Sequence, residues 1–328
     1  MKFEFTVHPN FNFVESFAKH FSLPVKNNSV NFPSHKGEGF IRGVELYPYL
    51  KFVIHHYLLK EDFFLTRLPA DQENEMLSLV FYNQEIPIST YKNKDEIIRF
   101  LKQHEATIQI ASSGLSTHAF FPKDTEIHYV VIGIQRKNLK SLLKIPNATN
   151  DLLDHITQGD APFYYCEELT DNIAFELNNL MLVDTDEKLS SLAYQVIIQK
   201  ILYLLFQKLL RRTGELRYPI NKEDAQKITE IRTMILQDMS SPPQLENLAI
   251  QAGMSQTKMK KLFKQVYGDS IYQYYQTLRM QKAALLLKQK DFSVTEVGYQ
   301  LGFSNMSHFS RLFKRYHGST PKAYTKVG

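Results

Sequence analysis

The alternation of apolar and polar positions is strand-like in the first part of the chain. Up to about residue 135, short segments rich in Val, Ile, Phe and Tyr are separated by Gly, Pro, Asn and Asp, which is typical of β-strands bounded by turns. The segments that we predict as strands are 42–48, 49–59, 76–83, 106–112, 116–122 and 126–134. Residues 94–104 are predicted as a helix between them, because their apolar positions are three and four residues apart.

After residue 136 the apolar period becomes helical. The predicted helices are Asn138–Leu143, Asn150–Gln158, Cys166–Leu182 and Glu187–Arg212. The last helix has two apolar stripes, one with Leu189, Leu192, Val196, Tyr203 and Leu210, the other with Ile197, Ile201, Leu204 and Leu205. A helix that is apolar nearly all round must be covered on two sides. A core helix of its own domain and a helix shared with a second subunit fit this pattern equally well.

Residues 211–223 combine Gly, Pro, Asn and charge, which is the composition of a linker. We therefore expect an α+β protein with a β-rich domain over residues 1–160, a helical connector or dimerisation segment over 161–215, and an all-α domain over 222–328. The short, closely spaced strands favour a sandwich or a small barrel over a parallel α/β sheet.

The charge is divided unevenly between these parts. The chain has 328 residues and a formal net charge of +5, which is small. From Lys222 to the end, however, there are sixteen Lys and Arg against eight Asp and Glu, so the remainder of the chain has a net charge of −3. A basic module beside a mildly acidic remainder is expected where one domain binds a polyanion.

Cysteine usage and hydropathy predict a cytoplasmic protein without a membrane partner. Cys166 is the only cysteine, so an intrachain disulfide is impossible, and we expect it to be a small apolar residue of the core. Acidic and polar residues interrupt the first thirteen positions, which therefore do not resemble a signal peptide. The most apolar long run, 192–210, contains Lys200 and three glutamines. These polar residues interrupt it, so we do not predict it to span a membrane.

The adjacent pair His55 and His56 is the strongest hint of a metal site. Neighbouring residues of a strand point to opposite faces, so the two imidazoles cannot readily bind one ion. A metal-binding β-barrel of the cupin type would also need a His-x-His pair with a nearby Glu and a later His, and this set is absent from the sequence. We expect neither a metal nor a cofactor, and no catalytic residues.

The C-terminal region contains a diverged internal repeat, residues 248–268 and 297–318. Gly253 corresponds to Gly302 at an offset of 49, whereas Leu262 corresponds to Leu312 at an offset of 50, so the second copy has one extra residue. Each copy reads as a helix, a glycine-containing turn and a second helix. This is the helix-turn-helix pattern, in which the second helix lies in the major groove of DNA.

Helical periodicity gives each second helix an inner and an outer face. The inner positions are Met259, Leu262, Phe263 and Val266 in the first copy, and Phe309, Leu312, Phe313 and Tyr316 in the second. The outer positions are Thr257, Lys258, Lys260, Lys261 and Lys264, and Met306, Ser307, Ser310, Arg311 and Lys314. A solvated charged face usually mixes signs, so an acid-free outer face that occurs in both copies favours contact with phosphates.

Residues 225–325 resemble the DNA-binding domain of AraC/XylS transcription regulators. The resemblance is carried by Leu248, Ala249, Gly253, Met254, Ser255, Phe263, Gly268, Tyr274, Arg279, Ala283, Leu287, Gly302, Phe303, Ser304, Phe309, Phe313, Lys314, Gly318 and Pro321. Two positions depart from the family pattern. Gly298 stands where the family usually has Ala, and Thr325 where it often has Arg.

The resemblance implies two recognition helices in successive major grooves, ~34 Å apart on one face of the duplex. Its base-contacting positions fall on Thr257, Lys260, Lys261, Met306, Ser307, Ser310 and Arg311, and its phosphate-contacting positions on Lys258, Lys264, Lys314 and Arg315. We expect Arg311 and Lys261 to bind guanine edges and Met306 to meet a thymine methyl.

The β-rich first part followed by a long apolar helix is similar to the cupin-like sensor arrangement of this family, and residues 37–59 resemble the sensor domains of pyochelin-type siderophore regulators. The resemblance implies a small-molecule effector and a homodimer, and it allows RNA polymerase as a partner. Enzymatic alternatives require a cysteine cluster or the missing His and Glu set, and an architectural DNA binder has no need of the first 220 residues. A ligand-responsive transcription regulator without catalytic activity is the favoured hypothesis.

Overall fold

The computed structural model describes residues 1–70, 76–82, 107–145, 151–158, 163–211, 220, 222–289 and 291–327. Within these residues the chain divides into two units, Met1–Ala225 and Gln226–Gly328. The helix predicted over 94–104 lies outside the described residues. The predicted role of 161–215 as a connector stays a prediction.

A seven-stranded sheet is the centre of the first unit. Its strands are β2 (Ser29–Asn31), β3 (Gly37–Tyr47), β4 (Leu50–Leu59), β6 (Met76–Tyr82), β7 (Thr107–Ser112), β9 (Glu126–Gln135) and β10 (Tyr164–Glu168). They lie in the order β10-β7-β6-β9-β4-β3-β2, and each neighbouring pair is antiparallel. The predicted β-rich character of this part is confirmed.

A second sheet packs against one face of the first. It consists of β1 (Lys2–Thr6), β5 (Phe63–Leu68) and β8 (Thr117–Phe121), in the order β1-β5-β8. An aromatic core that includes Phe17 of helix α1 (Phe13–Phe21) fills the space between the sheets. Phe121 of the small sheet stacks on Tyr129 of the large one, with ring centroids 5.6 Å apart. The sequence patterns did not predict β1, β2, β5 or α1, but they did predict a sandwich, which the two sheets form.

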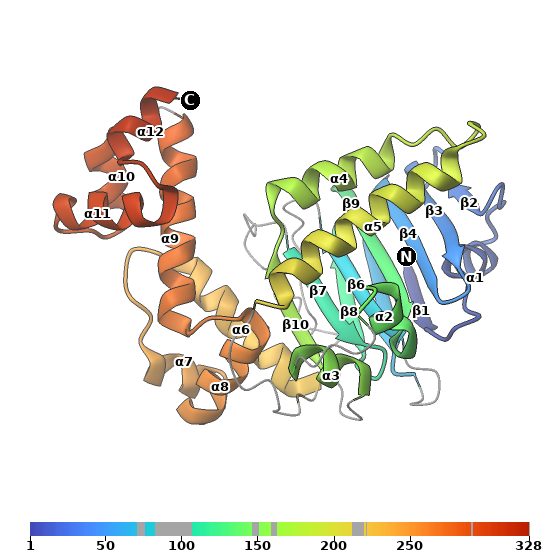
Figure 1. Ribbon diagram of the computed structural model, residues 1–328, viewed down its shortest axis with the longest axis horizontal. Coiled ribbons are helices and arrows are strands. Elements are labelled where there is room, and N and C mark those ends of the chain that lie inside the picture. Colours follow the sequence, from blue (N-terminus) through green and yellow to red (C-terminus); the bar gives the residue numbers. More distant parts are fainter. Residues whose placement is uncertain are drawn as a thin grey trace. The chain divides into compact units, whose positions relative to one another are not determined.

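Helices cover the other face of the large sheet (Figure 1). They are η2 (Arg136–Asn138), α2 (Leu139–Leu142), α3 (Asp151–Gln158), α4 (Asp171–Met181) and α5 (Ser190–Leu209). One stripe of α5, which includes Ile198 and Leu205, is fully buried against the sheet. The stripe of Leu189, Leu192, Val196 and Tyr203 is 53% to 62% exposed. The core therefore accounts for only one of the two apolar faces that the sequence shows.

The helix predicted over Cys166–Leu182 is wrong in its first turn. Cys166 lies on strand β10, opposite Gln109 of β7, and its thiol is buried. The helix begins only at Asp171, where the hydroxyl of Thr170 accepts a hydrogen bond from the backbone N–H of Ile173. Pairing with an available sheet edge outweighs local helical periodicity here.

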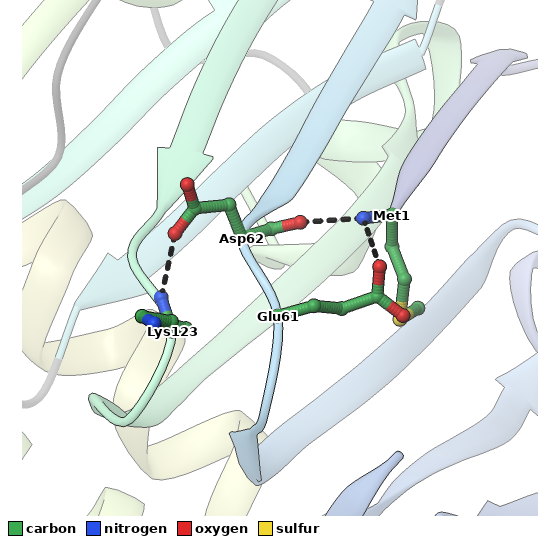
Figure 2. A network of polar contacts seen from close by, with 4 residues as sticks. All are labelled: Met1, Glu61, Asp62 and Lys123. Carbon is green, nitrogen blue, oxygen red and sulfur yellow. Dashed lines mark hydrogen bonds and ion pairs between the residues drawn. The ribbon is translucent and has the colours of Figure 1, made fainter.

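A small polar network fixes the start of β1 (Figure 2). The amino group of Met1 donates hydrogen bonds to a carboxylate oxygen of Glu61, at 3.0 Å, and to the backbone carbonyl of Asp62. The Asp62 carboxylate accepts a hydrogen bond of 3.0 Å from the backbone N–H of Lys123. These contacts tie β1 and the turn before β9 to the turn between β4 and β5.

The second unit is helical, with α6 (Lys222–Gln237), α7 (Leu245–Gln251), α8 (Gln256–Tyr267), α9 (Ile271–Gln289), α10 (Val294–Gln300), α11 (Met306–His317) and α12 (Pro321–Val327). The long helix α9 contacts α8 as well as α10, α11 and α12 (Figure 1). The capping box expected at the start of α10 is present, since Ser293 and Glu296 exchange both of its hydrogen bonds. The predicted all-α domain with two helix-turn-helix units is confirmed.

Candidate nucleic-acid interface

Two helix-turn-helix units form the repeat, α7 with α8 and α10 with α11. Each turn contains a glycine in the left-handed region, Gly253 at φ 58° and Gly302 at φ 77°. Glycine adopts this conformation without the steric penalty that other residues incur. The turn glycines are therefore local requirements of the fold at both places.

The helices α8 and α11 have the same kind of cap at each end, a side-chain oxygen at the N-terminus and a left-handed glycine at the C-terminus. The side chain of Ser255 accepts a hydrogen bond from the N–H of Lys258, and that of Asn305 accepts one from the N–H of His308. The left-handed glycines Gly268 and Gly318 end the two helices. Because the caps are 50 positions apart and the turn glycines 49, the extra residue of the second copy lies in its turn. From the cap onward the two copies align without a gap.

The inner faces confirm the periodicity argument. Met259, Leu262, Phe263 and Val266 are buried beneath α8. Phe309 and Phe313 are fully buried beneath α11, and Leu312 and Tyr316 are partly buried against the same core. Packing of these side chains fixes the rotation of each helix about its axis, and thus the residues that it presents outward.

Most of the candidate DNA-contacting residues lie on the exposed faces. The exposed side chains are Thr257, Lys258, Lys260, Lys261 and Lys264 on α8, and Ser307, Arg311, Lys314 and Arg315 on α11. Ser310 is half-buried. Neither helix contains Asp or Glu. Two exposed, acid-free faces in homologous positions are the arrangement that a polyanion would neutralise.

Met306 differs from the other candidates because its side chain is partly buried against the core of the second helix-turn-helix unit. A Cβ atom placed on Gly298 of α10 would lie only 2.6 Å from the Met306 sulfur. The missing side chain of Gly298, which is the departure from the family pattern, thus makes room for Met306. The first residue of α11 has a packing contact that the sequence patterns did not predict.

His308 is an exposed residue of α11 that the sequence patterns did not select. It occupies the position that Lys258 holds in α8. Alignment of the two copies at an offset of 50 from the caps would have identified it.

The repeat also extends further than the sequence patterns showed. Ser270 caps α9 as Thr320 caps α12, since each side chain accepts a hydrogen bond from the backbone N–H three residues later. Tyr274 then packs edge-on against Phe263, and Tyr324 packs in the same way against Phe313, with ring centroids 5.4 and 5.3 Å apart. Each of the helices α8 and α11 is thus held by an edge-on contact between a phenylalanine and a tyrosine.

Contacts at the centre of the second unit set the positions of the two helix-turn-helix units. Arg279 of α9 is buried, donates to the Leu301 carbonyl at the end of α10, and lies 3.9 Å from the centroid of the Phe303 ring. The Tyr275 hydroxyl donates to the Met239 carbonyl, in the segment between α6 and α7. Gly302 abuts the same segment, because a Cβ there would lie 1.7 Å from the Ser240 carbonyl oxygen. Two recognition helices held at a fixed spacing can address two grooves of one duplex.

The histidine pair in the first unit lies as predicted on opposite faces of β4. His55 stacks on Tyr129 between the sheets, at a centroid distance of 4.0 Å, and burial lowers its pKa to about 3. His56 points to the other face, where its Nε2 lies 3.1 Å from a carboxylate oxygen of Glu126. Among the described residues, no group of three or more His, Cys, Asp and Glu side chains is arranged to hold a metal ion.

No helix of the described ranges is both long enough and apolar enough to span a membrane.

Comparisons with known proteins agree with this geometry. A family model described as a helix-turn-helix domain matches residues 248–326. The HTH-type transcriptional regulator GbdR of Pseudomonas aeruginosa is 32% identical over 96 residues, which are 29% of this chain and 26% of GbdR. The chain thus matches about a quarter of the length of that relative.

Two further proteins show how far the similarity extends. The transcriptional activator PerA of Escherichia coli O127:H6 is 26% identical over 270 residues, which cover 78% of this chain and 92% of PerA. A solved transcriptional regulator with an AraC-type DNA-binding domain, from Chromobacterium violaceum, is 29% identical over 32% of this chain and 95% of its own, with a TM-score of 0.30. Residues 248–326, with their paired helix-turn-helix units, are thus similar to the helix-turn-helix domains of AraC/XylS transcription regulators, as the sequence motifs predict.

Proposed function

We propose that this chain is a sequence-specific DNA-binding transcription regulator that places α8 and α11 in successive major grooves of one duplex. The single observation that carries the proposal is the pair of exposed, acid-free faces on two homologous helices of one unit. One such face could be an ordinary solvated surface. Its occurrence at the same positions of both copies is what a repeated contact with phosphates requires.

The proposal divides the exposed side chains into two roles. The base edges are contacted by Thr257, Lys260, Lys261, Ser307, Ser310 and Arg311. Met306 lies beside the exposed face of α11. Lys258, Lys264, Lys314 and Arg315 bind phosphates. Lys261 and Arg311 are equivalent residues at an offset of 50, so each copy has a basic residue suited to the O6 and N7 acceptors of guanine. Phosphate contacts set the register, and base contacts set the sequence preference.

Footprinting with the full chain on the DNA that flanks its own gene tests this proposal. We expect protection of two neighbouring major-groove segments, about 10 base pairs apart. Lys260→Glu and Lys314→Glu should abolish protection, while the matched charge reversal Lys60→Glu, at an exposed position of the first unit, should leave it unchanged. Equal loss in all three variants would mean that the basic faces have no special part in binding.

We further propose that the regulator is a homodimer joined along α5. Its exposed stripe of Leu189, Leu192, Val196 and Tyr203 can face the same stripe of a second copy, as a two-fold interface requires. Sedimentation of the full chain tests this part. Val196→Glu should produce monomers, whereas Lys60→Glu, at an exposed position outside α5, should not. A monomeric wild-type chain at micromolar concentration would refute the dimer and leave the DNA-binding proposal intact.

The first unit, in this proposal, binds a small-molecule effector, and the chain catalyses no reaction. Support comes from the sandwich attached to the DNA-binding unit, as the family resemblance implies. Footprints with and without a small-molecule extract of the source cells should differ in strength or extent. Identical footprints under both conditions would argue against effector control.

A further inference from the structure

His308 is the exposed residue of α11 that the proposed DNA contacts leave out. It lies in the first turn of the helix, and its backbone N–H donates to the side chain of Asn305, at 3.0 Å. Counted from the caps, it occupies the position that Lys258 holds in α8, whose backbone N–H donates to the side chain of Ser255. The two copies of the repeat therefore present different side chains on the same local backbone.

The place of His308 on the helix favours a contact with the DNA backbone. His308 precedes the buried Phe309, and an α-helix turns by about 100° per residue, so His308 lies about 90° from the middle of the exposed face, where Ser307 and Arg311 lie. Arg315, about two turns later, is on the same flank. A helix in the major groove faces base edges with the middle of its exposed face and sugar-phosphate backbone with its flanks.

The imidazole of His308 is oriented by one aromatic contact. Its ring packs edge-on against Phe303 in the turn before α11, with ring centroids 5.8 Å apart. The Arg279 guanidinium of α9 lies 3.9 Å from the centroid of the same Phe303 ring. Within the described part of the chain, the imidazole forms no hydrogen bond or ion pair. Both ring nitrogens are thus available to a hydrogen-bonding group from outside the chain.

The elements around His308 offer cations and almost no acid. The helices α9, α10 and α12 pack against α11, and residues 302–305 of the turn are uncharged. Glu296 is the one acidic residue of these helices, and it lies in the first turn of α10, at the end away from the turn that holds Phe303. The cations of the four helices, besides His308 and His317, are Arg279, Lys282, Lys288, Arg311, Lys314, Arg315, Lys322 and Lys326.

We infer that His308 binds a DNA phosphate in the second helix-turn-helix unit, at the position of Lys258 in the first, and that this contact strengthens as the pH falls. The inference rests on the proposed function, because the phosphate belongs to the DNA that α11 enters. A neutral imidazole donates one hydrogen bond to a phosphate oxygen, whereas an imidazolium donates with the help of its charge. Histidine side chains change charge near neutral pH and lysine side chains do not, so only the second unit has this dependence.

A packing role is the alternative, in which the imidazole only covers the Phe303 ring. This role predicts that His308→Gln lowers the melting temperature and weakens DNA binding by the same factor at every pH. A phosphate contact predicts that His308→Gln resembles the wild type at pH 8 and loses the tighter binding at pH 6.

Fluorescence anisotropy of the full chain at pH 6 and pH 8 tests the inference, on the duplex protected in footprinting and on a scrambled duplex of the same composition. The wild type should bind both duplexes ~5-fold more tightly at pH 6, which is the difference expected between a charge-assisted and an ordinary hydrogen bond. The slope of the logarithm of the binding constant against the logarithm of the salt concentration should be steeper at pH 6, by about one phosphate contact.

Reciprocal exchange between the two copies gives the sharpest variants. His308→Lys should bind equally well at both pH values. Lys258→His should add a second pH-dependent contact, so the ratio of the two affinities should rise to ~25-fold if the contacts are independent. His317→Gln is the control, because His317 is the other histidine of residues 226–328 and its ring nitrogen lies 2.9 Å from the Met280 carbonyl oxygen. This variant should keep the wild-type ratio.

Melting temperatures without DNA separate losses of folding from losses of binding in these variants. DNA binding that is independent of pH in the wild type overturns the inference alone, and so does a pH dependence that persists in His308→Lys or His308→Gln. Absence of binding to either duplex at both pH values overturns the proposed function together with the inference.

Discussion

Arg311 and Lys264 are both exposed and basic, but their places on the two helices give them different proposed roles. Arg311 lies on the exposed face of α11, and Lys264 lies near the C-terminal end of α8. We expect Arg311→Ala to cost ~1–3 kcal/mol of binding free energy on cognate DNA and to relax base preference at one position. Lys264→Ala should weaken binding to all sequences alike. It should also reduce the slope of the logarithm of the binding constant against the logarithm of the salt concentration, by the amount expected for about one phosphate contact.

Fluorescence anisotropy on cognate and scrambled duplexes, at several salt concentrations, measures both effects. Equal losses on the two duplexes for Arg311→Ala would show that this residue binds phosphate and not a base.

Gly298 and Met306 form a second residue-scale pair. A methyl group at position 298 would meet the Met306 sulfur at 2.6 Å and Phe309 at 3.3 Å. Gly298→Ala should therefore lower the free energy of unfolding by ~1 kcal/mol or more, because the crowding exceeds the gain in helix propensity. In a Met306→Ala background the same change should be neutral or stabilising. Urea unfolding of the wild type, the two single variants and the double variant measures the coupling, and additive effects would contradict the packing contact.

At the scale of elements, sequence patterns predicted best where several local signals agree. The two recognition helices were predicted because burial period, caps and glycine ends agree. The end of β10, from Cys166 to Glu168, was predicted as helix, since its strand conformation depends on pairing with β7, a contact that no local pattern records. The aromatic pairs of Tyr274 and Tyr324 were missed for the same reason, because they join separate elements.

Within the candidate site, the outward positions followed from periodicity, but the packing of Met306 did not. Its burial depends on the absence of a side chain at Gly298, on a different helix. Properties set by contacts between elements require the structure.

Gly302, in the turn between α10 and α11, packs closely against the segment before α7. Both Gly302 and Gly318 have left-handed φ values, 77° and 74°. A Cβ at 302 would meet the Ser240 carbonyl oxygen at 1.7 Å, whereas a Cβ at 318 would meet nothing within 4 Å. We expect Gly318→Ala to cost ~1 kcal/mol of stability, which is the conformational term alone, and Gly302→Ala to cost considerably more. Thermal unfolding of both variants measures the difference, and equal melting temperatures would show that the Ser240 segment moves aside freely.

At the scale of the whole molecule, the buried His55 makes the stability of the first unit sensitive to acid. His55 is fully buried in the first unit, and its pKa falls to about 3 in the folded chain. Below about pH 6.5 the unfolded chain binds a proton that the folded chain does not, so stability decreases as the pH falls from there toward 3. His55→Leu should reduce the loss of unfolding free energy between pH 7.5 and pH 5 by about 2 kcal/mol. Parallel pH profiles of wild type and variant would contradict this assignment.

The central claim is that one chain reads two successive major grooves with two homologous helices. Methylation interference tests it most directly, because methyl groups on guanine N7 block contacts in the major groove. With the full chain on its own operator, we expect two clusters of interfering guanines about 10 base pairs apart. Lys261→Ala should remove interference from one cluster only, and Arg311→Ala from the other. A single cluster, or loss of the same cluster in both variants, would contradict the account.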